Sequence, residues 1–166
     1  MKKNKLFLFF LIFLMITFAG CYSFRGGTVP EHLKTLQIVP VIDNSNFSNP
    51  EYKIDLETEL TNSFIKDRSF DLSDEDSDAK LSVSINSIVE TVNSVGQGEL
   101  EQERKITLTC SVEYYDNVNK KQIWKKNFSS YGLFDINQAF TARDETIKVI
   151  IKQISEDILL AIVSDW

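Results

Sequence analysis

The sequence is poor in the residues on which catalytic and metal sites most often depend. Its 166 residues include one histidine, His32, and two cysteines, Cys21 and Cys110. It contains no G-x-S-x-G, H-E-x-x-H, G-x-x-x-x-G-K-[ST] or G-x-G-x-x-G motif, so those common hydrolase, metalloprotease and nucleotide-binding sites are excluded. His32 has no cysteine or second histidine at ligand spacing and is expected at the surface. We therefore expect neither an enzyme nor a protein with a bound metal.

The apolar run Leu6–Phe18 is too short for a permanent transmembrane helix. As an α-helix its thirteen residues would rise only ~20 Å, whereas a bilayer has a hydrocarbon core of ~30 Å. Lysines at positions 2, 3 and 5 precede this run and small residues follow it. This order is typical of a secretory signal peptide, which we assign to residues 1–20.

Cys21 ends the sequence Phe18-Ala19-Gly20-Cys21, which resembles a bacterial lipobox. The resemblance implies that the Cys21 sulfur receives a diacylglycerol and that the new amino terminus receives an acyl chain. Residues 21–33 would then form a lipidated tether, and no other cofactor is expected. The alternative is an ordinary signal peptide that happens to be followed by a cysteine.

Residues after the signal peptide are strongly acidic and suffice for one domain. Removal of residues 1–20 removes three lysines and no acidic residue, which leaves 15 basic and 24 acidic side chains among 146 residues. A net charge of −9 argues against a nucleic-acid partner. We expect one domain over residues 34–166.

Hydrophobic periodicity predicts an α+β two-layer sandwich. The expected elements are a strand at Thr35–Ile42, a helix at 50–66, strands at 80–95, 104–115 and 122–131, and a helix at 141–164. Both helices are amphipathic, so we expect them to cover one face of a mostly antiparallel four-stranded sheet.

Local signals refine this prediction. In the first strand Leu36, Ile38 and Ile42 are expected to share one face. Pro40 lacks an N–H group, which favours an edge position or an end to pairing there. The alternation in strand 80–95 changes phase, which predicts a β-bulge near 86–88. Cys110 lies in the apolar alternation of strand 104–115 and is expected as a small buried residue. Thr141 and Asp144 resemble a capping box at the start of the last helix.

Asp74, Asp76 and Asp78 have the spacing of the first three calcium ligands of an EF-hand loop. Ala79 stands where that loop requires glycine, and Ile85 stands where it requires the closing glutamate. We therefore interpret this stretch as a solvated acidic turn.

The whole mature chain resembles the lipopolysaccharide-assembly lipoproteins of the LptE family. The resemblance rests on lipobox Cys21 with its aromatic, glycine-containing tether, on the order of elements, and on a specific segment from the return strand to the last helix. That segment comprises Asn127-Phe128-Ser129-Ser130-Tyr131, Phe134-Asp135, Gln138-Ala139, Ala142, Glu145 and the terminal Trp166.

This resemblance implies a periplasm-facing lipoprotein of the outer membrane, anchored by the lipid on Cys21. Such proteins plug the β-barrel translocon LptD, assist its assembly and contact lipopolysaccharide. The alternative is an envelope lipoprotein of similar fold that binds a small ligand or an envelope polymer, since a fold alone does not define function. That alternative would need a sizeable pocket between the helices and the sheet.

Basic side chains on one hairpin are candidates for contact with the phosphates of lipopolysaccharide. The candidates are Lys120, Lys121, Lys125 and Lys126, with Arg104 and Lys105 second. The simpler interpretation, which we favour at this point, is that these lysines protect an exposed sheet edge against aggregation.

Overall fold

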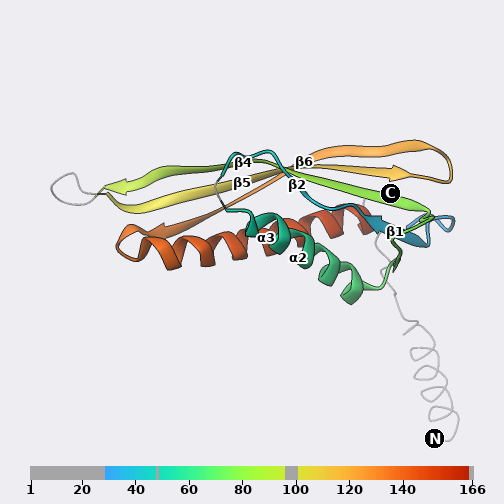
Figure 1. Cartoon of the computed structure of the whole chain (residues 1–166), viewed down its shortest axis with the longest axis horizontal. Coiled ribbons are helices and arrows are strands. Elements are labelled where there is room, and N and C mark those ends of the chain that lie inside the picture. Colours follow the sequence, from blue (N-terminus) through green and yellow to red (C-terminus); the bar gives the residue numbers. More distant parts are fainter. Residues whose placement is uncertain (1–28, 48, 96–100, 165–166) are drawn as a thin grey trace, which may run out of the picture.

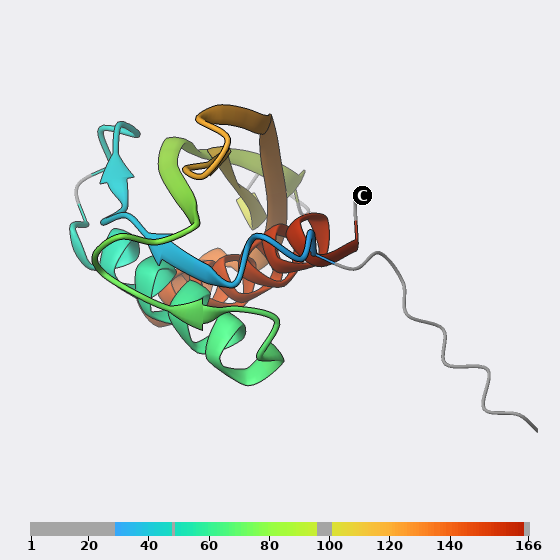
Figure 2. The same cartoon turned by 90° about the vertical axis from the view of Figure 1, so that its right-hand side faces the viewer.

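The computed structural model describes residues 29–47, 49–95 and 101–164, which form two layers. The predicted signal peptide, Cys21 and Trp166 lie outside these residues. A long sheet forms one layer and two helices, side by side, form the other (Figures 1 and 2). The elements in chain order are β1 (Thr35–Ile38), β2 (Ile42–Asp43), α2 (Glu51–Asp67), β3 (Asp71–Leu72), β4 (Ala79–Val95), β5 (Glu101–Asp116), β6 (Lys121–Asp135), the 3₁₀ turn η1 (Ile136–Gln138) and α3 (Ala139–Ser164).

The sheet is mixed and has six strands, whereas the sequence predicted a mostly antiparallel sheet of four. Its order is β3-β1-β4-β5-β6, with β2 also paired to β4. Strands β4, β5 and β6 are antiparallel, but β1 and β2 run parallel to β4, and β1 runs parallel to β3. Helix α2 carries the chain back between β1 and β4, and such a crossover brings strands together in parallel. Strands β2 and β3 have two residues each, too few for a periodic signal. The α+β class and the two helices on one face are as predicted.

Pro40 splits the first predicted strand into β1 and β2. Val41 is buried beside the break, and Ile42 is 58% exposed. The sequence had placed Ile42 on the same face as Leu36, and this prediction was wrong. The phase of the alternation changes where the strand is interrupted at Pro40.

The three long strands have one face in the core. The predicted bulge in β4 is confirmed between Ile85 and Ser87, and it returns Ile88 to the buried face. In β5 the buried row is Ile106, Leu108, Cys110, Val112, Tyr114 and Asp116. Cys110 is buried as expected, and burial raises the pKa of its thiol to about 12, which makes it unreactive.

Helix α2 begins and ends with identifiable backbone signals. The side chain of Asn49 accepts a hydrogen bond of 3.0 Å from Glu51 N–H, and Pro50 already has helical dihedral angles. At the other end Arg68 has φ 65°, and its N–H donates to the carbonyl of Phe64. Tyr52, Leu56, Leu60 and Phe64 are the buried residues of this helix.

Helix α3 begins at Ala139, two residues before the predicted start, so the predicted capping box is wrong. The Asp144 carboxylate instead accepts a hydrogen bond of 2.7 Å from Tyr52 Oη, which joins the two helices. On β6, Gly132 lies directly beneath Thr146 of α3. Two residues earlier on β6, Ser130 Oγ donates a hydrogen bond of 2.8 Å to Gln153 Oε1 of α3.

Candidate functional site

The sheet face that points away from the helices is open, and its side chains form rows across β4, β5 and β6. Six successive rows, counted from the β5–β6 turn, are Lys80–Tyr115–Gln122, Ser82–Glu113–Lys125, Ser84–Ser111–Asn127, Ser87–Thr109–Ser129, Val89–Thr107–Tyr131 and Thr91–Lys105–Leu133. We call the third and fourth rows the hydroxyl rows, because five of their six side chains are serine or threonine.

The character of this open face changes along its length. In the second row Lys125 Nζ lies 3.6 Å from Glu113 Oε2. In the hydroxyl rows Thr109 and Ser129 are joined by a hydrogen bond of 3.0 Å. In the last two rows Lys105 Nζ lies 4.3 Å from the centre of the Tyr131 ring, beside exposed Val89 and Leu133. The face therefore passes from charged through hydroxylated to partly apolar.

Lys125 and Lys126 do not act together, because neighbouring residues of a strand point to opposite faces. Lys125 lies on the open face, in the ion pair with Glu113. Lys126 is opposite Val112 in the buried row and places its Nζ 5.2 Å from the centre of the Trp124 ring.

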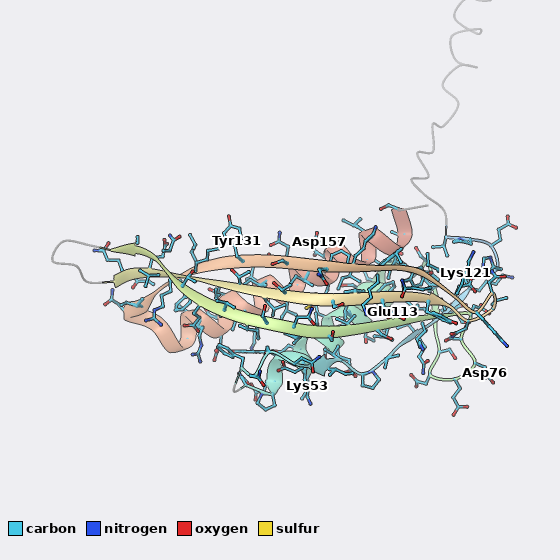
Figure 3. The ribbon with its side chains drawn as sticks, turned by 90° about the horizontal axis from the view of Figure 1, so that it is seen from above. Lys53, Asp76, Glu113, Lys121, Tyr131 and Asp157 are labelled. Atoms are coloured by element: carbon cyan, nitrogen blue, oxygen red, sulfur yellow. The ribbon has the colours of Figure 1, made fainter. Side chains whose placement is uncertain are left out.

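Lys120 and Lys121 lie apart from this pair, where the turn between β5 and β6 ends and β6 begins. Both are exposed, and Lys120 has φ 52°. Figure 3 shows Lys121 at one end of the sheet and Tyr131, which contacts Lys105, much farther along it.

Arg104 and Lys105 lie toward the opposite end of the sheet, again on opposite faces. Arg104 Nη1 is 3.4 Å from Glu90 Oε2, and Arg143 of α3 reaches the other oxygen of Glu90 at 3.9 Å. The six basic candidates thus lie at three points along the sheet, on opposite faces at two of them, and form no single cluster.

The β5–β6 turn is fixed to the start of the domain by Asp116. This carboxylate is 1% exposed and accepts hydrogen bonds from His32 Nε2 at 2.8 Å and from the backbone and side chain of Asn119. Burial alone would raise the pKa of Asp116, but the hydrogen bonds from Asn119 and His32 outweigh it and lower the pKa to about 2. His32 is 41% exposed, so it is at the surface as predicted. The sequence did not predict its pairing with Asp116, 84 residues away.

Asp78 of the acidic turn has a structural role. Its carboxylate accepts the backbone N–H groups of Lys34 and Thr35 at 2.9 and 3.0 Å, and these bonds lower its pKa. Among the described residues, no group of three or more His, Cys, Asp or Glu side chains is placed to hold a metal ion.

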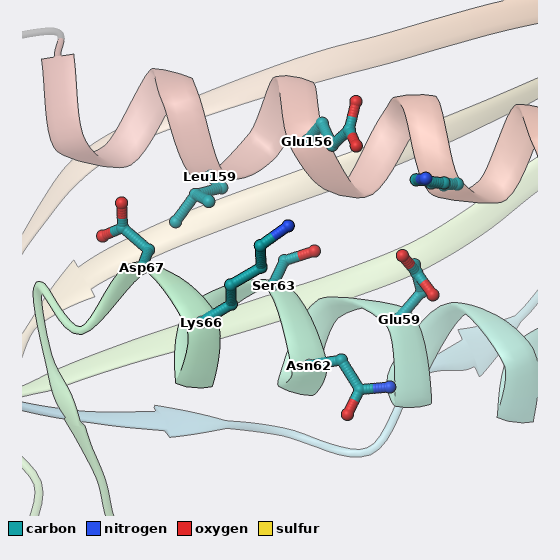
Figure 4. A pocket seen from close by; sticks show the side chains of 8 residues that line it. Glu59, Asn62, Ser63, Lys66, Asp67, Glu156 and Leu159 are labelled. Atoms are coloured by element: carbon teal, nitrogen blue, oxygen red, sulfur yellow. The ribbon is translucent and has the colours of Figure 1, made fainter.

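The surface of the described part includes three hollows that lie elsewhere than between the helices and the sheet. A groove of about 540 Å³ runs between α2 and α3 on the outer side of the helix layer (Figure 4). Its charged side chains are of both signs: Glu59, Lys66, Asp67, Lys152 and Glu156. A hollow of about 300 Å³ lies between the start of the domain and residues 68–71, and one of about 130 Å³ lies on the open face. These hollows do not meet the requirement of the small-ligand alternative.

Sequence reasoning missed two residues that organise the site, Asp116 and Gly132. Asp116 continues the buried alternation of β5, and a carboxylate at such a position signals a partnered buried charge. Gly132 carries no comparable sequence signal, because only the approach of α3 makes its small size necessary.

The fold defines an α+β protein in which two helices cover one face of a long sheet. The sequence profile of the LptE family, described as lipopolysaccharide-assembly, matches residues 33–162. The chain therefore belongs to the LptE family, and the expected resemblance is confirmed. The family is described by a role in lipopolysaccharide assembly, which agrees with the expectation that the chain is not an enzyme. A comparison with curated protein sequences gives no match.

Solved structures share this fold at low sequence identity. A protein from Chlamydia trachomatis, CT253, aligns with a TM-score of 0.59 at 9% identity, over 78% of this chain and 95% of that one. A minor lipoprotein from Acinetobacter baumannii aligns with a TM-score of 0.54 at 16% identity, over 78% and 92%. The protein XCC0632 from Xanthomonas campestris gives 0.58 at 11% identity, over 85% and 92%.

In the described ranges, no helix combines the length and apolar character needed to cross a membrane.

Proposed function

We propose that this protein is an outer-membrane lipoprotein that plugs an LptD-like β-barrel, assists its assembly and serves lipopolysaccharide transport to the cell surface. Membership of the LptE family carries the proposal. The lipid on Cys21 would hold the protein at the periplasmic side of the outer membrane. The partners are then the barrel, lipopolysaccharide and the membrane itself.

The hydroxyl rows support the plug role. The interior of a membrane β-barrel is polar, so a plug needs a surface that forms hydrogen bonds with polar side chains and water. Ser111 and Thr109 lie near the centre of the open face and provide such groups, whereas an apolar partner would leave the Ser111 hydroxyl without a hydrogen bond. We infer that this face meets the lumen of the barrel.

Bulk added to the hydroxyl rows should abolish recovery of the barrel. We expect affinity purification of the wild-type protein from envelope extracts to recover a large β-barrel protein, and T109W/S111W to recover little of it. The control K53W/K148W places the same two side chains at exposed helix positions and should behave like wild type. Failure of the wild type to recover any barrel would refute the plug role, and equal recovery by T109W/S111W would refute the assigned face.

Replacement of Cys21 by serine should remove lipid from the protein. Serine has no sulfur to form the thioether, so labelling of cells with a palmitate analogue should mark the wild-type protein and leave C21S unlabelled. Cys110 is the natural control, because it is buried and C110S should be labelled like wild type. Undiminished labelling of C21S would exclude Cys21 as the acylated residue.

Loss of the hairpin lysines should weaken lipopolysaccharide binding. We propose that Lys120, Lys121, Lys125 and Lys126, and secondarily Arg104 and Lys105, face glycolipid phosphates. The purified quadruple Lys→Gln variant should then bind purified lipopolysaccharide more weakly than wild type. The difference should shrink as salt rises, because exposed charges are screened with a Debye length of ~8 Å at physiological ionic strength.

A matched control exchanges four lysines of the helix layer, at 53, 66, 148 and 152, for glutamine. This control lowers the net charge by the same amount as the hairpin variant. Surface changes of this kind usually alter stability within ~0.5 kcal/mol. Equal affinity of wild type and the hairpin variant at both salt concentrations would restore the edge-protecting interpretation.

A further inference from the structure

The turn between β5 and β6 combines an apolar tip with two cations. Val118 is 54% exposed at this tip, and Lys120 and Lys121 follow it. Within the part of the chain that the structure describes, neither lysine makes an ion pair. An exposed apolar side chain beside cations suits the boundary between water and an anionic lipid surface.

The turn also lies where the chain enters the domain. His32 Nε2 is 3.0 Å from Asn119 Nδ2, and Asp116 holds both residues. His32 follows Cys21 by eleven residues, which span at most ~40 Å when fully extended. A lipid on Cys21 would therefore keep this turn, at the same end of the domain, within reach of the bilayer.

Charge is distributed unevenly around this end of the molecule. Asp74, Glu75 and Asp76 are exposed in the turn before β4. Figure 3 shows Asp76 and Lys121 at the same end of the sheet but on opposite sides of it. An anionic surface would attract the side that carries the lysines and repel the side that carries the carboxylates.

We propose that the β5–β6 turn rests on the phospholipid surface that holds the Cys21 lipid. Val118 lies at the level of the headgroups, and Lys120 and Lys121 bind lipid phosphates. This inference rests on the proposed lipid anchor and deepens it, because it fixes how the anchored domain is oriented. It adds the phosphates of the bilayer surface to the glycolipid phosphates already proposed for these two lysines.

The test uses the lipidated protein, reconstituted in vesicles of phosphatidylethanolamine and phosphatidylglycerol. V118C is labelled with an environment-sensitive dye, and D76C, labelled likewise, serves as the comparison position. Buried Cys110 does not compete for the dye. The V118C dye should show blue-shifted emission and quenching by spin-labelled lipids, whereas the D76C dye should report water.

Charge reversal should release the turn. In K120E/K121E, the ratio of contacting to non-contacting orientations should fall by at least ~30-fold, given the effect of two lysines near an anionic surface. Replacement of phosphatidylglycerol by phosphatidylcholine should have a similar effect on the unmodified turn. The control K53E/K148E makes the same charge change on exposed helix positions and should leave the emission of the V118C dye unchanged.

Palmitate labelling of the same preparation separates the two proposals. A protein without palmitate refutes the lipid anchor, and the inference falls with it. A palmitate-labelled protein whose V118C dye reports water, or whose emission is insensitive to K120E/K121E, overturns the membrane contact alone.

Discussion

Replacement of Leu108 by alanine should lower the free energy of unfolding by about 2–5 kcal/mol, the range found for large-to-small changes in well-packed cores. Leu108 is fully buried in β5, the strand between β4 and β6. It stands opposite Ile88 on one side and Ser130 on the other. Its loss removes apolar contacts and leaves a cavity that the surrounding strands and α3 can fill only in part. Denaturant titration should show a lower midpoint with an unchanged slope.

Thr109 provides the control for this prediction, because it is the next residue along β5 and points to the open face. T109A removes the hydrogen bond to Ser129 at a position exposed to water, so its cost should stay below about 1 kcal/mol. Similar midpoints for L108A and T109A would contradict the assignment of the Leu108 row to the core.

Replacement of Gly132 by alanine should destabilise the protein by about 1–3 kcal/mol, as overpacking of a core does. A Cβ atom at position 132 would lie 2.3 Å from Thr146 Cγ2, which is far inside contact distance. The Thr146 side chain is fixed by its hydrogen bond of 2.7 Å to the carbonyl of Ala142, so the methyl group cannot easily turn away. Helix α3 must shift from β6, and the loss should be measurable by thermal or denaturant unfolding.

The variant T146S tests the cause directly, because it removes the clashing methyl group and keeps the hydroxyl. We expect G132A/T146S to be more stable than the sum of the single changes predicts, with a favourable coupling energy of about 0.5–3 kcal/mol. The remaining neighbour, Ile150, would lie at 3.5 Å, an ordinary contact. An equal cost of G132A in both backgrounds would show that Thr146 is not the obstacle.

Hydrophobic periodicity predicted the long helices and strands of this fold, because each of them shows a complete apolar pattern within its own sequence. The buried row of β5, the bulge near 86–88 and the apolar stripe of α3 all agree with the structure. The two-residue strands could not be predicted in this way, since β2 and β3 depend on partners distant in sequence. The error at Ile42 has the same origin, because the alternation was extended through Pro40.

The candidate site was predictable only in its composition. The sequence identified the basic residues, but it indicated only in part that they lie apart from one another in the fold. The opposite faces of Lys125 and Lys126 follow from strand alternation, and this could have been inferred. The position of Lys120 beside the start of the domain depends on the His32–Asp116 contact, whose members are 84 residues apart. No local pattern indicates such a pair.

The parallel pairing of β1 with β4 has a consequence for the order in which the chain assembles. Leu36 pairs with Ala79, 43 residues later, whereas β4, β5 and β6 follow one another as antiparallel neighbours. Closing the longer loop costs more chain entropy before any contact compensates for it. We therefore expect the three long strands and α3 to form first, and β1 to join this preformed surface last. The segment nearest the membrane anchor would then be the last part of the domain to become native and the first to open.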